Sequence, residues 1–259
     1  MNPNARRAEI LVIIPAYNEE RHIGDVVRGV SAALPDADVL VIDDGSWDRT
    51  RFLAREAGAR VVSHVFNLGY GAALQTGYKR ADRDHYAYVV QLDADGQHRP
   101  TELPRLLEPL RQGGADVVIG SRFVAASGYR MGTARTLGRK MLGRLLLALG
   151  GPRVADPTSG LQALARPAFR LCCGEFYPAD FPDIDVLLFL HRQGLRIAEV
   201  PVEMAPSPPG KVALHGGLRD VYYMYKMLLS TFRSRLGPRI RTALDPASTA
   251  RQSHEEVIS

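Results

Sequence analysis

Apolar and polar positions follow two alternating patterns along the first half of the chain. Short apolar runs bounded by turn residues are typical of buried strands, and longer segments with apolar residues three or four positions apart are typical of amphipathic helices. The predicted strands cover residues 10–15, 39–43, 60–64, 86–92 and 116–120, and the predicted helices cover residues 20–33, 48–57, 71–81 and 101–112. This alternation predicts an α/β fold with a mostly parallel central sheet and helices on both of its faces.

The second half of the chain is less regular. Its pattern predicts helices at 133–149 and 182–193 and strands at 161–165 and 196–202. A Pro-rich connector then leads to an amphipathic helix at 218–236. We divide the chain into an N-terminal tail (1–8), one main domain (9–205), a connector with an amphipathic helix (206–241) and a disordered tail (242–259).

Composition adds an asymmetry of charge to this picture. The chain of 259 residues is 46% hydrophobic and 24% charged, an ordinary balance for a globular protein. Residues 121–241 hold 18 Lys and Arg against 8 Asp and Glu, although the whole chain carries only +5. A basic half favours an anionic partner such as a phosphate or a lipid surface. The chain has no recognisable motif for reading nucleic acid, so we expect no nucleic-acid partner.

Cysteines and terminal signals bear on the cellular location. The two cysteines, Cys172 and Cys173, are adjacent, and adjacent cysteines rarely bridge to each other, so we expect a reducing, cytoplasmic setting. The first residues are polar and contain arginine, so we expect no secretory signal. The sequence has no apolar run of the roughly 20 residues that a membrane-spanning helix needs.

The candidate chemistry begins directly after the apolar run at 88–92. The following residues are Asp93-Ala94-Asp95-Gly96-Gln97-His98. Alternate residues of a strand point to the same side, so both carboxylates can face one ion at the crevice where α/β sheets bind ligands. Carboxylates of this kind suit Mg²⁺ or Mn²⁺ held together with substrate phosphates. The alternative is a surface turn, because Asp-Gly is common in turns.

Six motifs in order extend this hypothesis to a family resemblance. They are Ile13-Ile14-Pro15-Ala16-Tyr17-Asn18-Glu19, Val41-Ile42-Asp43-Asp44-Gly45-Ser46, Asn67-Leu68-Gly69-Tyr70-Gly71-Ala72-Ala73, the Asp93–Asp95 motif, Gly120-Ser121-Arg122 and Asp156-Pro157-Thr158-Ser159-Gly160. The set resembles family 2 glycosyltransferases of the GT-A fold, most closely dolichol-phosphate mannose synthase and the bacterial polyprenyl-phosphate glycosyltransferases. The resemblance covers about residues 8 to 232 and implies that 9–205 is a GT-A catalytic domain.

The resemblance implies a nucleotide-sugar site at the ends of the first two strands. Pro15 closes the first strand, Tyr17 stacks on the nucleobase, and Glu19 contacts the base or the ribose. Asp43 and Asp44 lie beside the base, the first of them on the nucleoside. The alternative for Tyr17 is a half-buried loop aromatic, and the alternative for Asp44 is a turn residue or a charge at a helix N-terminus.

The diphosphate and metal positions follow from the next motifs. Gly71, with Gly69, lets the backbone at a helix start approach a phosphate. By resemblance, Asp93 lies near the ribose, the diphosphate and the metal, while Asp95 and Gln97 bind the metal. His98 is an alternative ligand to Gln97. The resemblance thus implies Mg²⁺ or Mn²⁺ as cofactor, with Asp95 in a catalytic role.

The resemblance also implies an acceptor phosphate site in the basic half. Arg122 and Arg135 are the best matches for binding the phosphate of the lipid. Lys211 matches a basic position near the donor or acceptor phosphate. Asp156 either orients the acceptor or acts as a base, and Ser159 hydrogen-bonds a phosphate; the alternative for their loop is a structural turn. The chain departs from the family pattern around Lys211, where it has Gly210 before the lysine and no upstream arginine.

The resemblance implies a metal-dependent, inverting transfer of a hexose from GDP-mannose or a UDP-sugar to a polyprenyl (dolichyl or undecaprenyl) phosphate, whereas the residues alone indicate only an anionic acceptor. A phosphate monoester is largely anionic near neutral pH, since its second pKa is about 6, and it needs positioning more than a base. The helix at 218–236 combines an apolar stripe with Arg219, Lys226 and Arg233 on another face. This pattern predicts a peripheral protein on the cytoplasmic face of the membrane. The alternative is a helix that packs on the core and has one solvated side.

Two alternatives remain open from the sequence. The first is a glycosyltransferase that acts on a hydroxyl group of a glycan or a small molecule. The second is a nucleotide-binding module without turnover. The sequence leaves the sugar, the nucleotide and the oligomeric state undetermined.

Overall fold

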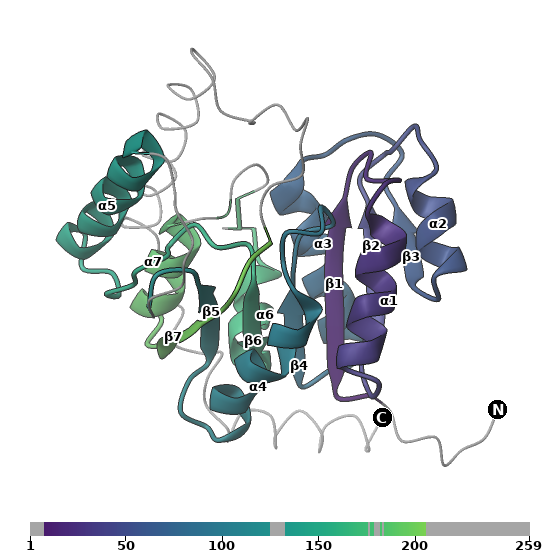
Figure 1. The fold of residues 1–259 in the computed structure, drawn as a ribbon. Coiled ribbons are helices and arrows are strands. Elements are labelled where there is room, and N and C mark those ends of the chain that lie inside the picture. The colour runs from purple at the N-terminus through teal and green to yellow at the C-terminus, as the bar shows by residue number, and fades with distance from the viewer. Residues whose placement is uncertain (1–7, 125–132, 176, 179–181, 183, 206–259) are drawn as a thin grey trace, which may run out of the picture.

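The described residues form one sheet of seven strands with helices on both faces (Figure 1). The structure is a computed structural model that describes residues 8–124, 133–175, 177–178, 182 and 184–205, with the backbone alone for 133–140. The strand order is β3-β2-β1-β4-β6-β5-β7. The strands are β1 Ile10–Ala16, β2 Asp38–Asp43, β3 Arg60–Ser63, β4 Tyr88–Gln91, β5 Val117–Ser121, β6 Gln162–Ala165 and β7 Ile197–Pro201.

All pairs of neighbouring strands are parallel except the two that involve β6, which is antiparallel to β4 and to β5. This confirms the predicted mostly parallel sheet. The chain moves from β1 to β2 and β3 on one side, and β4 then returns to the other side of β1. Such a reversal is a topological switch point, and ligands of α/β sheets bind in the crevice outside the carboxyl ends of the strands there.

The central strand β1 is buried on both faces because a layer of helices covers each face of the sheet. Ile10, Val12 and Ile14 point into the core on one side, while Leu11 and Ile13 point into the core on the other. The first core is closed by α1 Ile23–Ala33, α2 Thr50–Glu56, and α4 Leu103–Arg111 with the short 3₁₀ helix η1 Pro100–Glu102 before it. The second is closed by α3 Tyr70–Arg83, α6 Arg166–Cys172 and α7 Ile184–Arg192. The helix α5 Thr133–Ala148 packs on α7 through Leu142 and Leu146.

In the part of the chain that the structure describes, the sequence patterns predict every strand and every α-helix except α6. That helix has only 7 residues and starts at Arg166, directly after β6. A segment of this length holds less than two turns, so an apolar period cannot mark it. The helix predicted from residue 20 begins instead at Ile23, because residues 19–22 form a turn in which the His22 amide donates to Glu19 O at 3.0 Å.

The predicted connector and helix at 206–241 and both predicted tails (1–8, 242–259) fall almost entirely outside the described residues. Among the helices that the structure describes, none combines the length and the apolar character needed to cross a bilayer.

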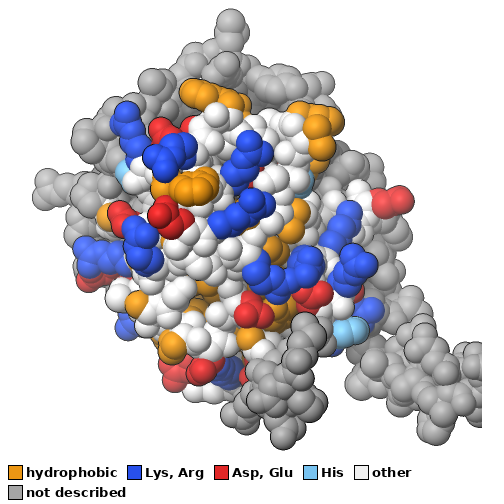
Figure 2. Space-filling view, turned by 90° about the vertical axis from the view of Figure 1, so that its right-hand side faces the viewer, with side chains coloured by type: hydrophobic (Ala, Val, Ile, Leu, Met, Phe, Trp, Pro, Cys, Tyr) orange, Lys and Arg blue, Asp and Glu red, His pale blue; other side chains and the backbone are white. Residues whose placement is uncertain are grey.

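The open side of the sheet at β3 and α2 carries charges of both signs. Figure 2 shows this side, with Lys and Arg interspersed with Asp and Glu and with hydrophobic side chains at the upper rim. In the loops after β2 and β3, Trp47, Val65 and Phe66 are exposed by 81%, 96% and 66%.

Candidate functional site

The loops that follow β1 and β2 are locked to each other by hydrogen bonds. The Asn18 amide donates to Ser46 Oγ at 3.0 Å, and the Trp47 amide donates to Asn18 Oδ1 at 3.1 Å. The Glu19 amide donates to Thr50 Oγ1 at 2.8 Å. Asn18 adopts a left-handed backbone (φ 56), which turns the chain sharply after the strand. The lock places Tyr17, 46% exposed, at the rim beside the end of β2.

Asp43 ends β2 as a buried carboxylate that is only half satisfied. Asp43 is 1% exposed, and its Oδ1 accepts a hydrogen bond from the Ser46 amide at 3.1 Å. Oδ2 is buried and has no hydrogen-bond partner among the described residues. A buried carboxylate oxygen without a donor is costly, so it marks a position where an N–H group of a ligand is favourable.

Asp44, the next residue, is turned into the protein instead. Its Oδ1 lies 2.7 Å from His64 Nδ1 and accepts the Leu68 amide at 2.9 Å. Its Oδ2 accepts the Gly69 amide at 2.9 Å. Asp44 therefore holds the segment that leads into α3, as the turn alternative expects. A contact between Asp44 and a nucleoside stays a prediction.

Asp93, two residues beyond β4, lies between the start of α3 and the loop at 156–160. The Tyr70 hydroxyl donates to Asp93 Oδ1 at 2.8 Å, and His98 Nε2 donates to Oδ2 at 3.1 Å. A Cβ on Gly160 would lie 2.6 Å from Asp93 Oδ2, so only glycine leaves room for the carboxylate there. Gly69, the N-cap of α3, has φ 101, and Gly71 is buried in the first turn.

Asp95 and Gln97 meet each other across the turn after β4. The Gln97 amide donates to Asp95 Oδ1 at 3.0 Å, and Gln97 Nε2 donates to Asp95 Oδ2 at 2.6 Å. His98 is 3% exposed and points to Asp93, so Gln97 is the residue that lies beside Asp95. In the described part of the chain, no three His, Cys, Asp or Glu residues gather as a metal cluster. One or two carboxylates and an amide oxygen nevertheless fit Mg²⁺ or Mn²⁺, which take further oxygens from substrate phosphates.

Arg122 follows β5 and forms a bidentate ion pair with Asp156. Arg122 Nε and Nη2 donate to the two carboxylate oxygens at 2.6 and 2.7 Å, and the Arg122 amide donates to Asp156 Oδ2 at 3.2 Å. The Asp156 side chain is fully buried, and that of Arg122 is 13% exposed. A fork of this kind fixes the plane of the guanidinium.

The loop that carries Asp156 is held at both ends. Glu199 on β7 accepts the amides of Ala155 and Asp156 at 2.6 and 2.8 Å. At the other end, Gln91 Nε2 donates to Gly160 O at 3.3 Å. Ser159 Oγ donates to Gly120 O at 2.6 Å. The Ser159 hydroxyl thus supports the loop, and its contact with a phosphate stays a prediction.

The remaining predicted residues are only partly described. Arg135 lies on α5, whose backbone is described at that position without the side chain, and Lys211 lies outside the described residues. Sequence reasoning missed Glu199 and the contacts of Tyr70 and Gly160 with Asp93. Tyr70 and Gly160 belong to the quoted motifs, whereas Glu199 has no local signal.

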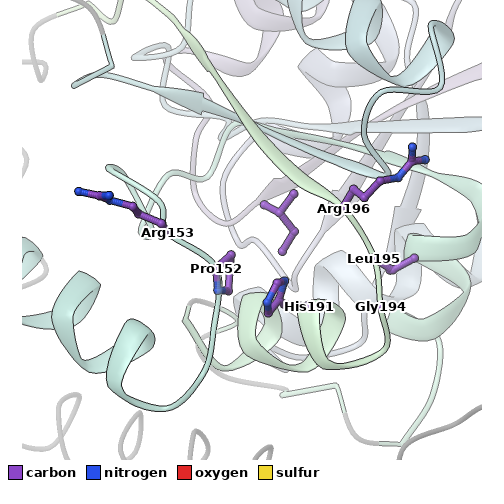
Figure 3. Close-up of a pocket in the computed structure, with 7 residues that line it drawn as sticks. Pro152, Arg153, His191, Gly194, Leu195 and Arg196 are labelled. Carbon is purple, nitrogen blue, oxygen red and sulfur yellow. The ribbon is translucent and has the colours of Figure 1, made fainter.

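A pocket of about 420 Å³ lies away from these residues, at the amino end of β7. Figure 3 shows its lining, in which the guanidinium groups of Arg153 and Arg196 point away from the pocket. Arg196 is paired with Asp116 at 3.1 Å, just before β5 begins. The pocket therefore lies at the amino ends of the parallel strands, whereas Asp43, Asp93 and Arg122 lie at or beyond the carboxyl ends.

Residues 11–170 match the family described as Glycosyl transferase family 2. The chain belongs to this family. It is 34% identical over 225 residues to the undecaprenyl-phosphate mannosyltransferase of Micrococcus luteus, covering 81% of this chain and 88% of that relative. It is 33% identical over 240 residues to the polyprenol monophosphomannose synthase of Mycolicibacterium smegmatis, covering 87% and 88% of the two chains.

Solved structures confirm the GT-A fold expected from the sequence. The glucosyl-3-phosphoglycerate synthase of Mycobacterium tuberculosis with Mn²⁺, UDP-glucose and phosphoglyceric acid has a TM-score of 0.64 and 27% identity. The match covers 88% of this chain and 79% of that structure. The same enzyme is also known with Mg²⁺ and UDP. These neighbours are consistent with use of a divalent metal.

Proposed function

We propose that this glycosyltransferase moves a sugar from a nucleotide-diphosphate sugar to a polyprenyl phosphate, with inversion at the anomeric carbon and with Mg²⁺ or Mn²⁺. The observation that carries the proposal is the position of Asp93, whose carboxylate contacts Tyr70 at the start of α3 and lies against Gly160. Asp93 therefore lies between the residues around Asp43, at the end of β2, and those around Arg122, at the end of β5. The two relatives named for polyprenyl phosphates, each matched over most of its length, support this acceptor.

The donor nucleotide is assigned to the ends of β1 and β2. Asp43 Oδ2 accepts an N–H of the base, which uracil and guanine both present, and so completes its hydrogen bonding. Tyr17 stacks on the base, Pro15 sets the course of its loop, and Glu19 contacts the base or the ribose. The N-terminus of the 14-residue helix α3, with Gly71 in its first turn, favours the diphosphate.

Asp95, Gln97 and Asp93 are the residues that we assign to the metal. A bound Mg²⁺ or Mn²⁺ would stabilise the charge that develops on the leaving nucleotide. Rotation of the Gln97 amide by half a turn exchanges its nitrogen for its oxygen and makes it a metal ligand. The Tyr70 hydroxyl and His98 hold the Asp93 carboxylate at its two oxygens.

The acceptor phosphate is assigned to Arg122, with Arg135 and Lys211 as further cations and Ser159 as a hydroxyl contact. The phosphate oxygen attacks the anomeric carbon in line with the leaving diphosphate, and it is already anionic, so no base has to activate it. Both oxygens of Asp156 accept hydrogen bonds from Arg122. We therefore assign Asp156 the role of orienting Arg122 and not that of a base.

One other acceptor is favoured by a specific observation. The structural neighbour is a synthase crystallised with phosphoglyceric acid, which carries both a phosphate and a hydroxyl group. A phosphorylated small molecule, attacked through its hydroxyl, is therefore the second candidate. In that reaction a base is needed, and Asp156 is the candidate for it.

Transfer into organic solvent separates the two candidates. The purified protein is incubated with Mn²⁺ or Mg²⁺ and a panel of labelled GDP- and UDP-sugars, in one set with undecaprenyl or dolichyl phosphate and in a second set with phosphoglyceric acid. Metal-dependent movement of label into the organic phase supports the proposal and identifies the sugar. Label that moves only to a phosphorylated small molecule contradicts it. The variant Asp95→Ala is the control, because it should bind no metal and abolish transfer without unfolding.

A further inference from the structure

Glu199 is an acidic residue of an edge strand whose carboxylate is used entirely on neighbouring backbone. β7 is the last strand of the sheet. The Ala155 amide donates to Glu199 Oε2 at 2.6 Å, and the Asp156 amide donates to Oε1 at 2.8 Å. One carboxylate thus accepts two consecutive N–H groups, which fixes the peptide plane between Ala155 and Asp156.

Hydrogen bonds connect this peptide to Arg122 at the carboxyl end of β5. Asp156 accepts bonds from Arg122 Nε, Nη2 and the backbone amide at 2.6, 2.7 and 3.2 Å. Arg122 follows Ser121, the last residue of β5, and β5 pairs with β7 so that Ile119 lies opposite Glu199. The contacts therefore form a closed ring from β7 through the loop to Arg122 and back through β5. Because of these contacts, we expect a change at Glu199 to displace the Asp156 carboxylate and with it the guanidinium of Arg122.

We propose that Glu199 is a positioning residue for sugar transfer, which sets the orientation of Arg122 through Asp156. The inference rests on the proposed function, in which Arg122 binds the acceptor phosphate. Glu199 itself contacts neither substrate. A carboxylate is needed because a glutamine has one acceptor oxygen, and its NH₂ group would face the second amide N–H.

The first test varies donor and acceptor separately in Glu199→Gln and Glu199→Ala. Loss of one supporting hydrogen bond in Glu199→Gln should raise the KM for polyprenyl phosphate about tenfold. The KM for the nucleotide sugar should not change. A residue that only stabilises the fold would lower the active fraction, and hence kcat, with both KM values unchanged. That result, or wild-type kinetics in both variants, would overturn the inference.

Glu203→Gln is the matched control. Glu203 is four residues further along the same segment, its side chain is 67% exposed, and it pairs with Arg99 at 2.7 Å. Removing its charge should leave both KM values unchanged. An acceptor KM raised equally by Glu203→Gln would show that net negative charge, not the clamp on the two amides, is responsible.

A second measurement needs no acceptor. In a spectrum of ¹⁵N-labelled arginine side chains, the Arg122 Nε–H signal is assigned by its absence in Arg122→Lys. The signal should shift and exchange faster with water in Glu199→Gln, and stay unchanged in Glu203→Gln. An unchanged signal in Glu199→Gln would refute the positioning role.

The two measurements fail in different ways. If the wild-type protein transfers sugar to no polyprenyl phosphate, the proposed function is wrong, and the acceptor part of the inference falls with it. The Arg122 signal still decides whether Glu199 orients Arg122 through Asp156. If transfer occurs but the acceptor KM does not respond to Glu199→Gln, the proposed function stands and the positioning role is wrong.

Discussion

At the residue scale, the neighbouring carboxylates of Asp43 and Asp44 differ in their hydrogen bonding, and we expect them to differ in role. Asp43 has one buried oxygen without a hydrogen-bond partner among the described residues. Both oxygens of Asp44 accept hydrogen bonds from backbone amides of the segment before α3. Buried polar atoms are nearly always paired, so we expect the unpaired oxygen of Asp43 to accept a hydrogen bond from a ligand. The resemblance assigns the first of the pair to the nucleoside, but the partners of Asp44 at Leu68 and Gly69 are 24 and 25 positions away, and no local pattern predicts them.

Asp43→Asn should weaken nucleotide binding without weakening the fold. The amide can still accept the Ser46 N–H, but it replaces an oxygen by an NH₂ group where a base N–H would approach. We expect the Kd for UDP or GDP with Mn²⁺ to rise about tenfold, measured by titration calorimetry. The midpoint of thermal unfolding without ligand should not fall. Equal nucleotide affinity in wild type and variant would exclude Asp43 from the base site.

Asp44→Ala should show the opposite balance. It removes the acceptor of the Leu68 and Gly69 amides and the partner of His64. We expect a loss of about 2–3 kcal/mol in the free energy of unfolding, measured with denaturant. A variant of unchanged stability would show that Asp44 does not anchor the entry to α3.

At the element scale, the loop from Asp156 to Gly160 connects the residues at the ends of β4 and β5, because it contacts both Asp93 and Arg122. The sequence predicts the strand ends and the residues that follow them, since apolar runs and motifs mark both. It does not predict that Arg122 pairs with Asp156, 34 positions away, or that Glu199 clamps the loop. These contacts depend on β5, β6 and β7 lying side by side, and no local pattern encodes that order.

Gly160→Ala tests the close approach of this loop to the end of β4. The added Cβ would lie 2.6 Å from Asp93 Oδ2, so the carboxylate must move. A displacement of about 1 Å at a reacting centre costs about 100-fold, and we expect a fall of that order in kcat/KM. Circular dichroism should show an unchanged fold. Activity within twofold of wild type would mean that Asp93 tolerates the shift.

A contact between Tyr86, which precedes β4, and Asp38, the first residue of β2, makes the stability of the fold sensitive to high pH. Burial, together with a hydrogen bond to Asp38, raises the pKa of Tyr86 from 10.0 to about 12. The folded state therefore keeps the phenol proton in a range where the unfolded chain loses it. This contribution is complete below pH 10 and is lost as the pH rises from 10 to about 12.

Urea unfolding across this range, in wild type and Tyr86→Phe, measures that contribution. Stability of the wild type should fall with pH between these limits, and the phenylalanine variant should show a shallower decline. Parallel curves for the two proteins would assign the alkaline loss to other groups.

At the scale of the whole molecule, the charge of the chain predicts where it works. The segment 206–241 lies outside the described residues, and its basic amphipathic pattern predicts binding to an anionic membrane on the cytoplasmic face. We expect the protein to sediment with vesicles containing phosphatidylglycerol and not with neutral phosphatidylcholine vesicles, and salt should weaken the binding.

Charge reversal locates this binding. Glutamate at Arg219, Lys226 and Arg233 should abolish sedimentation with anionic vesicles. Glutamate at Arg55, Arg83 and Arg111, three exposed arginines on α2, α3 and α4, changes net charge equally and should leave binding intact. Equal loss in both triple variants would show that net charge alone drives the association.

The reversed direction of β6 has a consequence for how this enzyme can diversify. Because β6 runs against β4 and β5, its beginning, and not its end, lies at the edge where Asp93 and Arg122 emerge. The chain between β5 and β6 therefore leaves the carboxyl end of β5 and returns to the neighbouring start of β6. Such an excursion can change in length and composition while its two ends stay fixed. We therefore expect that exchange of this connection between family members, with the α5 residues that pack on α7 retained, changes the acceptor and leaves nucleotide binding unchanged.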